Sequence, residues 1–179
     1  MELFEKRVDG EYKFEGRICR MRVDRAQLPD GKIVGREVVE HPGGVAVLPV
    51  DEDGICYLVK QYRYPMERVM LEVPAGKLEY GEEHRACAER ELSEETGFTA
   101  DRLIYLGGYA SSPGFCDEVL HLYLATGLHR GEMHPDEDEY LNVERYSLDE
   151  LLQMTDSGLI DDAKTVISIL YADRIINRK

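Results

Sequence analysis

The sequence predicts a fold of the α/β class, and three observations support this prediction. Runs of apolar and β-branched residues recur along the chain and are bounded by Gly, Pro and Asp turns, as β-strands usually are. The stretch 82–96 contains no Pro or Gly and is followed by Gly97, which is typical of a helix and its C-terminal cap. Two further helical patterns follow residue 146. We expect these helices to cover a sheet.

The composition is that of one acidic globular domain with a core. The 179 residues are 43% hydrophobic and 32% charged. The formal net charge of −14 argues against nucleic acid or an anionic membrane as a partner, because binding to either needs a basic surface. No apolar run approaches the length of a membrane span, and the four cysteines form no C-x-x-C pair. We therefore expect a soluble, cytoplasmic protein with reduced thiols.

The first 40 residues predict an N-terminal β-hairpin extension. Strand-like runs cover 16–23 and 33–40, and a turn signal lies between them at Leu28 to Gly31. The residues from Pro42 to Gly44 then break the pattern. We therefore divide the chain into an extension, 1–40, and a main domain, 41–179.

The main domain begins with three strand-like runs. Residues 45–50 and 55–63 predict a hairpin around an acidic turn, and 69–73 leads into a stiff bend at Pro74. Arg63 ends the second run where the apolar pattern gives way to a loop. It is either an edge cation on a polar rim or a contact to a phosphate, to which the guanidinium fork is well suited.

The helix predicted at 82–96 gathers three carboxylates on one side. Glu91 lies three and four residues before Glu94 and Glu95, so the three side chains are neighbours on the helix surface. The ordinary interpretation is a solvated acidic face. Like charges about 4 Å apart nevertheless repel by roughly 4 kcal/mol at an effective dielectric near 20, and a divalent cation would convert that repulsion into binding. Oxygen ligands favour Mg²⁺ or Mn²⁺ over zinc.

The stretch from Gly76 to Phe98 reads G-K-L-E-Y-G-E-E-H-R-A-C-A-E-R-E-L-S-E-E-T-G-F. It resembles the Nudix box, G-x5-E-x7-R-E-U-x-E-E-x-G-U with U a bulky apolar residue, and meets every specified position. The family cleaves nucleoside diphosphates linked to another moiety and uses a loop-helix-loop to hold divalent metal. The resemblance therefore implies a Nudix-type α/β/α sandwich with a mixed β-sheet.

The resemblance also implies roles for residues in and beside the box. It makes the Ala75 carbonyl and the carboxylates of Glu91 and Glu95 ligands of Mg²⁺, with Glu94 a further ligand in the catalytic group. Arg90 and Glu82 are expected to support these groups, because Arg90 can orient and partly neutralise the carboxylates.

The loop after the predicted strand 103–109 indicates a subfamily. Pro113 lies 16 residues beyond Gly97, and the loop from Ser112 to Glu118 precedes a strand at 119–126. The segment is either a simple turn or, by resemblance to the ADP-ribose pyrophosphatases, the loop that contacts the terminal ribose. Relatives that cleave GDP-sugars share part of this marker, so it narrows the substrate without choosing it.

The same resemblance extends to the N-terminal segment. In the ADP-ribose pyrophosphatase branch the N-terminal strands pair with a second subunit, and an arginine that matches Arg36 reaches the nucleotide. By itself Arg36 is a typical surface cation. The resemblance therefore implies a homodimer in which Arg36 contacts the substrate.

The segment 129–140 carries four consecutive acids at 136–139 before a strand at 141–146. A solvated loop is the ordinary interpretation. Hydrolysis also needs a base for water, and a carboxylate from a separate loop could supply it. The resemblance, through a Glu-x-Glu pair in related enzymes, makes Glu137 the base and Glu139 an additional metal ligand, although the two could be exchanged.

The end of the chain predicts two covering helices. Ser147 and Glu150 match a capping box for a helix to about residue 155, and Asp161 or Asp162 can cap a final helix with an apolar face. We expect no functional group in them.

Taken with the resemblance, the sequence predicts Mg²⁺-dependent hydrolysis of the diphosphate of ADP-ribose, or a similar ADP-sugar, to AMP and ribose 5-phosphate. One alternative is a pyrophosphatase for another nucleotide sugar such as GDP-mannose. Another, of a different class, is a module that senses the nucleotide without cleaving it. The complete box favours an enzyme.

Overall fold

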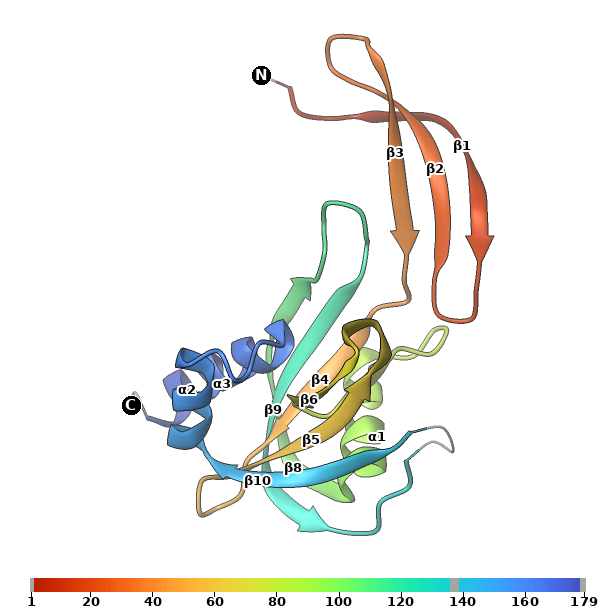
Figure 1. Ribbon diagram of the computed structural model, residues 1–179. Coiled ribbons are helices and arrows are strands. Elements are labelled where there is room, and N and C mark those ends of the chain that lie inside the picture. Colours follow the sequence, from red (N-terminus) through yellow and green to blue (C-terminus); the bar gives the residue numbers. More distant parts are fainter. Residues whose placement is uncertain (1, 136–138, 178–179) are drawn as a thin grey trace. The chain divides into compact units, whose positions relative to one another are not determined.

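The computed structural model describes residues 2–135 and 139–177. The chain divides into two compact units, which are treated separately (Figure 1). The first unit comprises Met1–Gly43 and Ala110–Val119, and the second comprises Gly44–Tyr109 and Leu120–Lys179.

The first unit is an antiparallel sheet of three strands in the order β1-β2-β3. The strands are β1 (Lys6–Glu15), β2 (Arg20–Gln27) and β3 (Ile33–Glu40). The predicted hairpin corresponds to β2 and β3, and its turn includes Gly31 at φ 87°, a conformation that favours glycine. Strand β1 was not predicted, because its charged residues interrupt any apolar run.

This sheet lacks a core of its own. All ten residues of β1 are exposed, and within 2–40 only Asp24 and Ala26 are buried. The loop from the distant segment 110–119 joins the end of β3, where the Val39 N–H donates to the Phe115 carbonyl at 2.7 Å and Val39 accepts from the Asp117 N–H at 3.1 Å.

The second unit combines two sheets with three helices. Its elements are β4 (Gly44–Pro49), β5 (Ile55–Arg63), the 3₁₀ turn η1 (Tyr64–Met66), β6 (Arg68–Glu72), β7 (Ala75–Lys77), α1 (His84–Thr96), β8 (Phe98–Ala110), β9 (Val119–Arg130), β10 (Leu141–Ser147), α2 (Leu148–Asp156) and α3 (Ala163–Ile176). One sheet has the order β7-β4-β9-β8, with β4 parallel to β9 and antiparallel to β7. The other, β10-β5-β6, is antiparallel. The predicted α/β class with a mixed sheet is confirmed.

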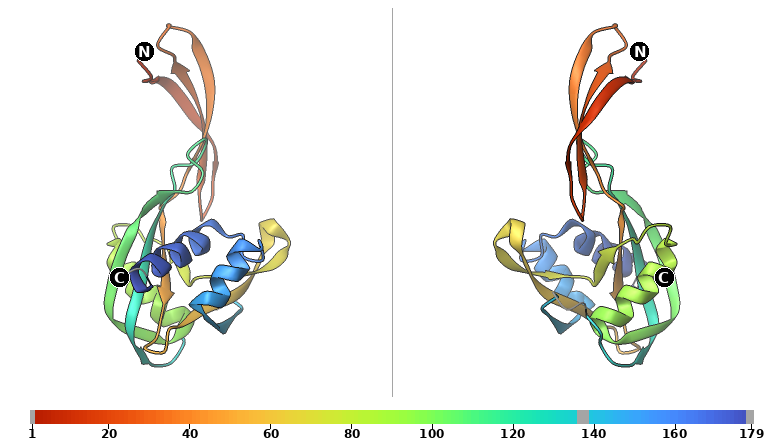
Figure 2. Two further views of the ribbon diagram at one scale, coloured as in Figure 1. Left: turned by 90° about the vertical axis from the view of Figure 1, so that its left-hand side faces the viewer. Right: turned by 90° about the vertical axis from the view of Figure 1, so that its right-hand side faces the viewer.

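The core lies on both faces of β4 and β9. Along β4, Val45 and Val47 face the cluster beneath α1, whereas Ala46 and Leu48 face the cluster formed with β5, α2 and α3. Figure 2 shows α1 and the α2–α3 pair on opposite sides of these strands. Burial on both faces explains why the run at 45–50 is apolar throughout.

The helix ends follow the predicted signals. Gly97 ends α1 at φ 72°, and its N–H donates to the Ser93 carbonyl at 2.8 Å. The capping box of Ser147 and Glu150 opens α2, and the side chain of Asp162 caps α3.

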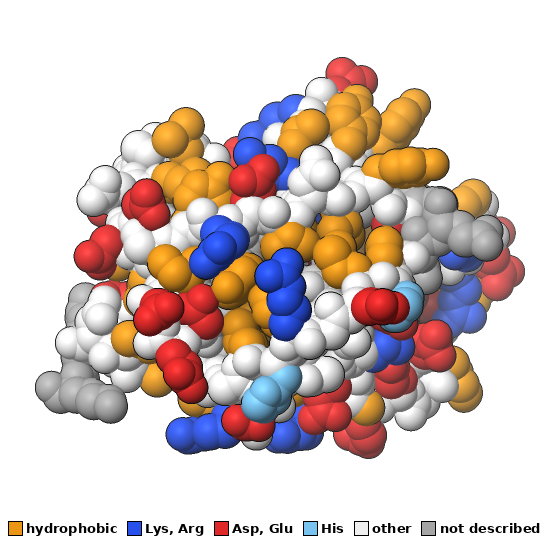
Figure 3. All heavy atoms as spheres, turned by 90° about the horizontal axis from the view of Figure 1, so that it is seen from below, with side chains coloured by type: hydrophobic (Ala, Val, Ile, Leu, Met, Phe, Trp, Pro, Cys, Tyr) orange, Lys and Arg blue, Asp and Glu red, His pale blue; other side chains and the backbone are white. Residues whose placement is uncertain are grey.

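One face of the molecule carries side chains of both charges. Acidic, basic and apolar side chains are interspersed over the face shown in Figure 3, in a chain of net charge −14. In the described part of the chain, no helix is both long and apolar enough to cross a membrane.

Candidate active site

Helix α1 presents two buried carboxylates beside its apolar contact with the core. Cys87, Ala88 and Leu92 pack into the cluster beneath β4, which fixes the rotation of the helix. Glu91 and Glu95 occupy the neighbouring stripe and are only 8% and 1% exposed. These two side chains therefore do not belong to a solvated acidic face, which was the ordinary interpretation of this helix.

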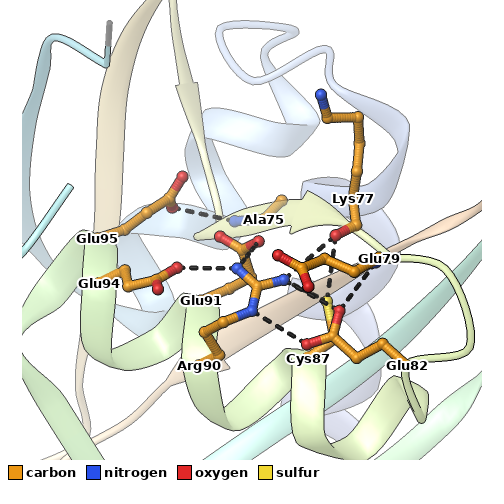
Figure 4. A network of polar contacts seen from close by, with 9 residues as sticks. All are labelled: Ala75, Lys77, Glu79, Glu82, Cys87, Arg90, Glu91, Glu94 and Glu95. Atoms are coloured by element: carbon orange, nitrogen blue, oxygen red, sulfur yellow. Dashed lines mark hydrogen bonds and ion pairs between the residues drawn. The ribbon is translucent and has the colours of Figure 1, made fainter. Parts of the chain in front are cut away.

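The backbone of β7 lies directly against these carboxylates (Figure 4). A Cβ atom at Gly76 would lie 1.8 to 2.4 Å from atoms of the Glu91 carboxyl group, so any side chain here would displace that group from its position. One residue earlier, the Ala75 N–H donates to Glu95 Oε2 at 3.0 Å. The first glycine of the motif thus has a steric reason, which is the close approach of backbone and carboxylate.

Arg90 links three carboxylates with one guanidinium (Figure 4). Its Nε and Nη2 donate to Glu82 at 3.0 and 3.1 Å, and its Nη1 donates to Glu91 at 2.7 Å and to Glu94 at 2.8 Å. The hydrogen bond from Arg90 lowers the pKa of Glu82 to about 2, and the Glu79 N–H also donates to that carboxylate. The role predicted for Arg90 and Glu82, to orient and partly neutralise the carboxylates of α1, requires hydrogen bonds of this kind.

Glu95 and Glu91 are held where a negative charge is unfavourable. Burial raises the pKa of Glu95 to about 8, and the nearby charges of Glu139 and Glu91 add to this effect, against a smaller opposing effect of the Ala75 N–H. Burial likewise raises the pKa of Glu91, and the opposing effect of Arg90 is smaller. A cation bound between Glu91 and Glu95 would favour the charged form of both carboxylates and so lower both pKa values.

The donor set fits a hard divalent cation. The donors are carboxylate oxygens, and Glu91 lies in a space that a side chain at Gly76 would fill. Within the described residues, no three His, Cys, Asp or Glu side chains form a group that could hold a metal. Mg²⁺ does not need one, because it commonly takes one or two carboxylates and completes its shell with water and phosphate oxygens.

The loop after β9 returns to the C-terminal end of α1. The Gly131 N–H donates to the Gly97 carbonyl at 2.6 Å, and the His134 N–H donates to the Glu94 carbonyl at 3.0 Å. Glu139 is half-buried, and its charge raises the pKa values of both Glu91 and Glu95. The structure therefore brings Glu139 to the carboxylates of α1, whereas Glu137 lies outside the described residues.

A buried glutamate, Glu72, holds the guanidinium of Arg63. Its Nε and Nη2 donate to the two carboxylate oxygens of Glu72 at 2.7 and 2.8 Å, and Lys164 also contacts Glu72. The positive charge of Arg63 acts on Glu95 and opposes the rise of its pKa. Glu72 and Lys164 were missed by sequence reasoning; the one available signal was an acidic residue inside the apolar run 69–73.

The remaining predicted residues belong to the first unit. Arg36 is exposed and donates to Glu5 from Nε at 2.9 Å and from Nη2 at 2.8 Å. The Ser112 carbonyl accepts from the N–H groups of the turn that follows it, and Glu118 accepts from the hydroxyl of Ser111 at 2.5 Å. Arg36, Ser112 and Glu118 thus belong to the first unit, whereas Ala75, Glu91 and Glu95 belong to the second.

Comparison with known proteins identifies the class. The model of the NUDIX domain matches residues 40–166, and that of the nucleoside diphosphate sugar hydrolase N-terminal domain matches residues 5–39. The chain belongs to the Nudix family of hydrolases, whose members generally depend on a divalent metal.

Individual relatives are similar over most of their length. An ADP-ribose pyrophosphatase of Bacillus subtilis is 44% identical, over 94% of this chain and 92% of the relative. A methanol dehydrogenase activator of Bacillus methanolicus is also 44% identical, over 93% and 91%. A GDP-mannose pyrophosphatase of Yersinia pestis is 31% identical, over 76% and 74%. A crystal structure of an ADP compounds hydrolase shares the fold, with a TM-score of 0.86 and 21% identity over 99% of this chain and 97% of that one.

Proposed function

We propose that this Nudix hydrolase cleaves the diphosphate of ADP-ribose, or of a similar ADP-sugar, to AMP and ribose 5-phosphate, and that its metal is Mg²⁺. The observation that carries the reaction class is the pair of buried carboxylates, Glu91 and Glu95, under the backbone of Gly76. The choice of ADP-ribose rests on the 44% identity to an ADP-ribose pyrophosphatase, against 31% to a GDP-mannose pyrophosphatase.

The metal would be held by the Ala75 carbonyl, Glu91 and Glu95. Glu94 and Glu139 would become further ligands only by moving closer, because no three acidic side chains of the described residues are grouped as a metal site. When bound, it neutralises the diphosphate and lowers the pKa of a water molecule. Arg90 keeps Glu91 and Glu94 in place through hydrogen bonds of 2.7 and 2.8 Å. Without it, three like charges would face one another on one side of α1.

The chemical step needs a base and a place for the diphosphate. Glu137, with Glu139 as the alternative, takes a proton from the attacking water, whose oxygen bonds to one phosphorus while the bridging oxygen leaves with the other phosphate. Arg63 contacts the diphosphate through its Nη1 edge, because Nε and Nη2 are engaged by Glu72. Arg36 and the loop from Ser112 to Glu118 contact the rest of the substrate.

A homodimer is part of the proposal, with 1–40 as the dimerisation extension and 41–179 as the hydrolase domain. The three-stranded sheet exposes Val8, Tyr12 and Phe14 and buries almost nothing by itself, so a second copy of the chain would cover its apolar side chains. Sedimentation at micromolar concentration is expected to give the mass of a dimer. A monomer at that concentration would contradict this part of the proposal.

The cytoplasm is the proposed location. Cys19, Cys56, Cys87 and Cys116 are all free thiols, as is usual in a reducing compartment.

The deciding experiment is a panel assay with ADP-ribose, GDP-mannose, NADH, diadenosine polyphosphates and nucleoside triphosphates, each with Mg²⁺ or Mn²⁺. The expected result is the highest kcat/KM for ADP-ribose, with AMP as product and no turnover after chelation of the metal. Faster cleavage of GDP-mannose would favour the alternative substrate. Tight binding of ADP-ribose without cleavage of any panel member would favour a sensing module instead.

A further inference from the structure

A chain of alternating charges runs through the second unit behind Arg63. Arg63 ends β5, Glu72 ends β6, and Lys164 lies in the first turn of α3. Glu72 accepts from Arg63 at 2.7 and 2.8 Å and from Lys164 Nζ, which also contacts Asp162 Oδ2 at 3.0 Å. The side chains of Glu72 and Lys164 are 2% and 11% exposed, so the interactions are little screened by solvent.

The N-terminal turn of α3 makes a second contact toward the active site. The Thr165 hydroxyl donates to Asp162 Oδ2 at 2.6 Å and accepts from the Val73 N–H at 2.9 Å. Val73 follows Glu72 and precedes the bend that leads to Ala75, whose N–H donates to Glu95. The end of α3 is thereby joined to both the arginine and the backbone next to the carboxylates.

Stability alone does not explain buried charges at this place. Replacing a buried ion pair with apolar residues of similar volume is often neutral or stabilising, so such a pair is weak evidence for a purely structural role. Apolar contacts already join the same elements. Val73, in the bend between β6 and β7, and Ile169, in α3, both pack in one core cluster.

The arrangement keeps the charge of Arg63 available. Glu72 engages Nε and Nη2, while among the described residues Nη1 has no hydrogen-bond partner. Lys164 offsets part of the negative charge of Glu72 and shares its own charge with Asp162, so the carboxylate that holds Arg63 is compensated from two sides. The guanidinium is also part-exposed, with 37% of the side chain accessible, and its charge acts on Glu95 of the carboxylate site.

We propose that Lys164 is a positioning residue: acting through Glu72, it fixes the guanidinium of Arg63 so that its Nη1 edge binds an anionic phosphate of the substrate. This inference rests on the proposed function, because it takes a diphosphate as the group that Arg63 meets. Lys164 itself touches neither the substrate nor the metal. It lies 92 residues from Glu72 in the sequence, in a helix expected to have only a covering role.

The test compares Lys164→Met with Lys164→Arg in the full-length protein. The Met variant keeps the length of the side chain but removes the charge. We expect KM to rise about tenfold to a hundredfold, because a misplaced guanidinium weakens its charge-assisted hydrogen bonds to the substrate. We expect kcat to change less. The Arg variant restores the charge and should return KM to within about threefold of the original value.

The matched control is Arg68→Met. Arg68 in β6 pairs with Asp161 just before α3, so it joins the same two segments, but both side chains are more than 40% exposed. A general loosening of the contact between β6 and α3 would affect both variants, whereas loss of positioning would affect only Lys164→Met. We expect the control to keep the KM of the original protein.

A binding measurement separates this inference from the proposed function. Calorimetric titration with ADP-ribose in the absence of divalent metal needs no turnover, and the Kd of Lys164→Met should rise as its KM does. If the original protein cleaves another compound of the panel better than ADP-ribose, the proposed substrate is wrong. The inference about Lys164 is then tested by the same measurements with that compound.

A double-mutant cycle tests whether Lys164 acts through Arg63. The KM of Arg63→Met combined with Lys164→Met should equal that of Arg63→Met alone. Unchanged KM and Kd in Lys164→Met, or additive effects in the double variant, would overturn the inference. If Lys164→Met does not fold, Lys164→Gln, which keeps a donor without charge, takes its place in every comparison.

Discussion

Glu95 and Glu72 are buried to the same extent, 1% exposed each, and lie in the same unit of the molecule, yet their pKa values move in opposite directions. The pKa of Glu95 is raised to about 8, chiefly by burial. Burial would also raise the pKa of Glu72, but the hydrogen bond from Arg63 and the charge of Lys164 lower it. Position inside the protein therefore does not decide the charge of a carboxylate; its partners do.

The contacts of the two carboxylates distinguish a proposed ligand-binding residue, Glu95, from a structural one, Glu72. Glu72 meets two cationic side chains of the chain itself, whereas Glu95 accepts a backbone N–H and has two further carboxylates nearby. The charge of Glu72 is compensated within the fold. The charge of Glu95 is not compensated within the fold in this way, and a bound cation would compensate it, as expected of a metal ligand.

The strongest test of this contrast is Glu95→Gln. The substitution keeps shape but removes a metal ligand, so turnover should fall by about 10³-fold, an effect comparable to the loss of a preorganised electrostatic group at a transition state. The unfolding temperature in chelator should rise near neutral pH, because the substitution removes a carboxylate whose charge is disfavoured by burial and no cationic partner is lost. Steady-state kinetics with Mg²⁺ and thermal unfolding measure the two effects.

Glu89→Gln serves as control for that variant, since Glu89 is exposed on the same helix and pairs with Arg85. Turnover close to that of the original protein in Glu95→Gln would refute the assignment of Glu95 as a ligand.

The four acids at 136–139 of the sequence extend the comparison to the proposed general base. Glu137→Gln should lower kcat by about 10²-fold to 10⁴-fold with little change in substrate binding, because a general base acts in the chemical step. Glu139→Gln should weaken metal binding as well as turnover. Rates over a range of Mg²⁺ concentrations distinguish these outcomes, with the exposed Glu132→Gln as control. A mild Glu137→Gln and a severe Glu139→Gln would reverse the two roles.

Gly76→Ala tests the geometry of the carboxylate site without removing a charge. Its Cβ would overlap the Glu91 carboxyl group, so the carboxylate must move away from β7. We expect kcat/KM to fall by about a hundredfold, as for other displacements of about 1 Å near the chemistry. Gly35→Ala, where a Cβ meets no atom within 4 Å, is the control. An unchanged Mg²⁺ dependence in Gly76→Ala would contradict the close approach as a functional requirement.

Glu72→Gln tests the compensated carboxylate of this comparison, through the stability of the fold at different pH values. Breaking a buried ion pair costs about 3 kcal/mol, so the unfolding temperature should fall at pH 7. The folded pKa of Glu72 lies below its ordinary value of 4.5, so the stabilisation is complete above that pH and disappears as the pH falls through the folded pKa.

The difference in unfolding temperature between the original protein and Glu72→Gln should therefore be largest near neutral pH and should narrow below pH 4.5. Glu144→Gln, which breaks the half-exposed pair with Lys60, should show little difference at any pH. A difference that persists unchanged into acid would mean that packing, not charge, is the contribution of Glu72.

Local features of the fold were predictable because each depends on neighbours in the chain. The C-terminal cap at Gly97, the capping box at Ser147 and the cap at Asp162 are all present where their signals lie. Strand β1 was missed because its pairing with β2, and not an apolar pattern of its own, holds it in the sheet.

By itself the sequence determined the family, through the match of residues 76–98 to the Nudix box. It also placed Glu91, Glu94 and Glu95 side by side, since spacings of three and four residues on one helix do so wherever that helix packs. Only the tertiary structure decided which of these carboxylates are buried, that Gly76 touches one of them, and that Glu139 approaches them from another loop. It also decided that Lys164 meets Glu72. Such contacts join segments far apart in sequence, and they depend on how sheets and helices pack together, which no local pattern encodes.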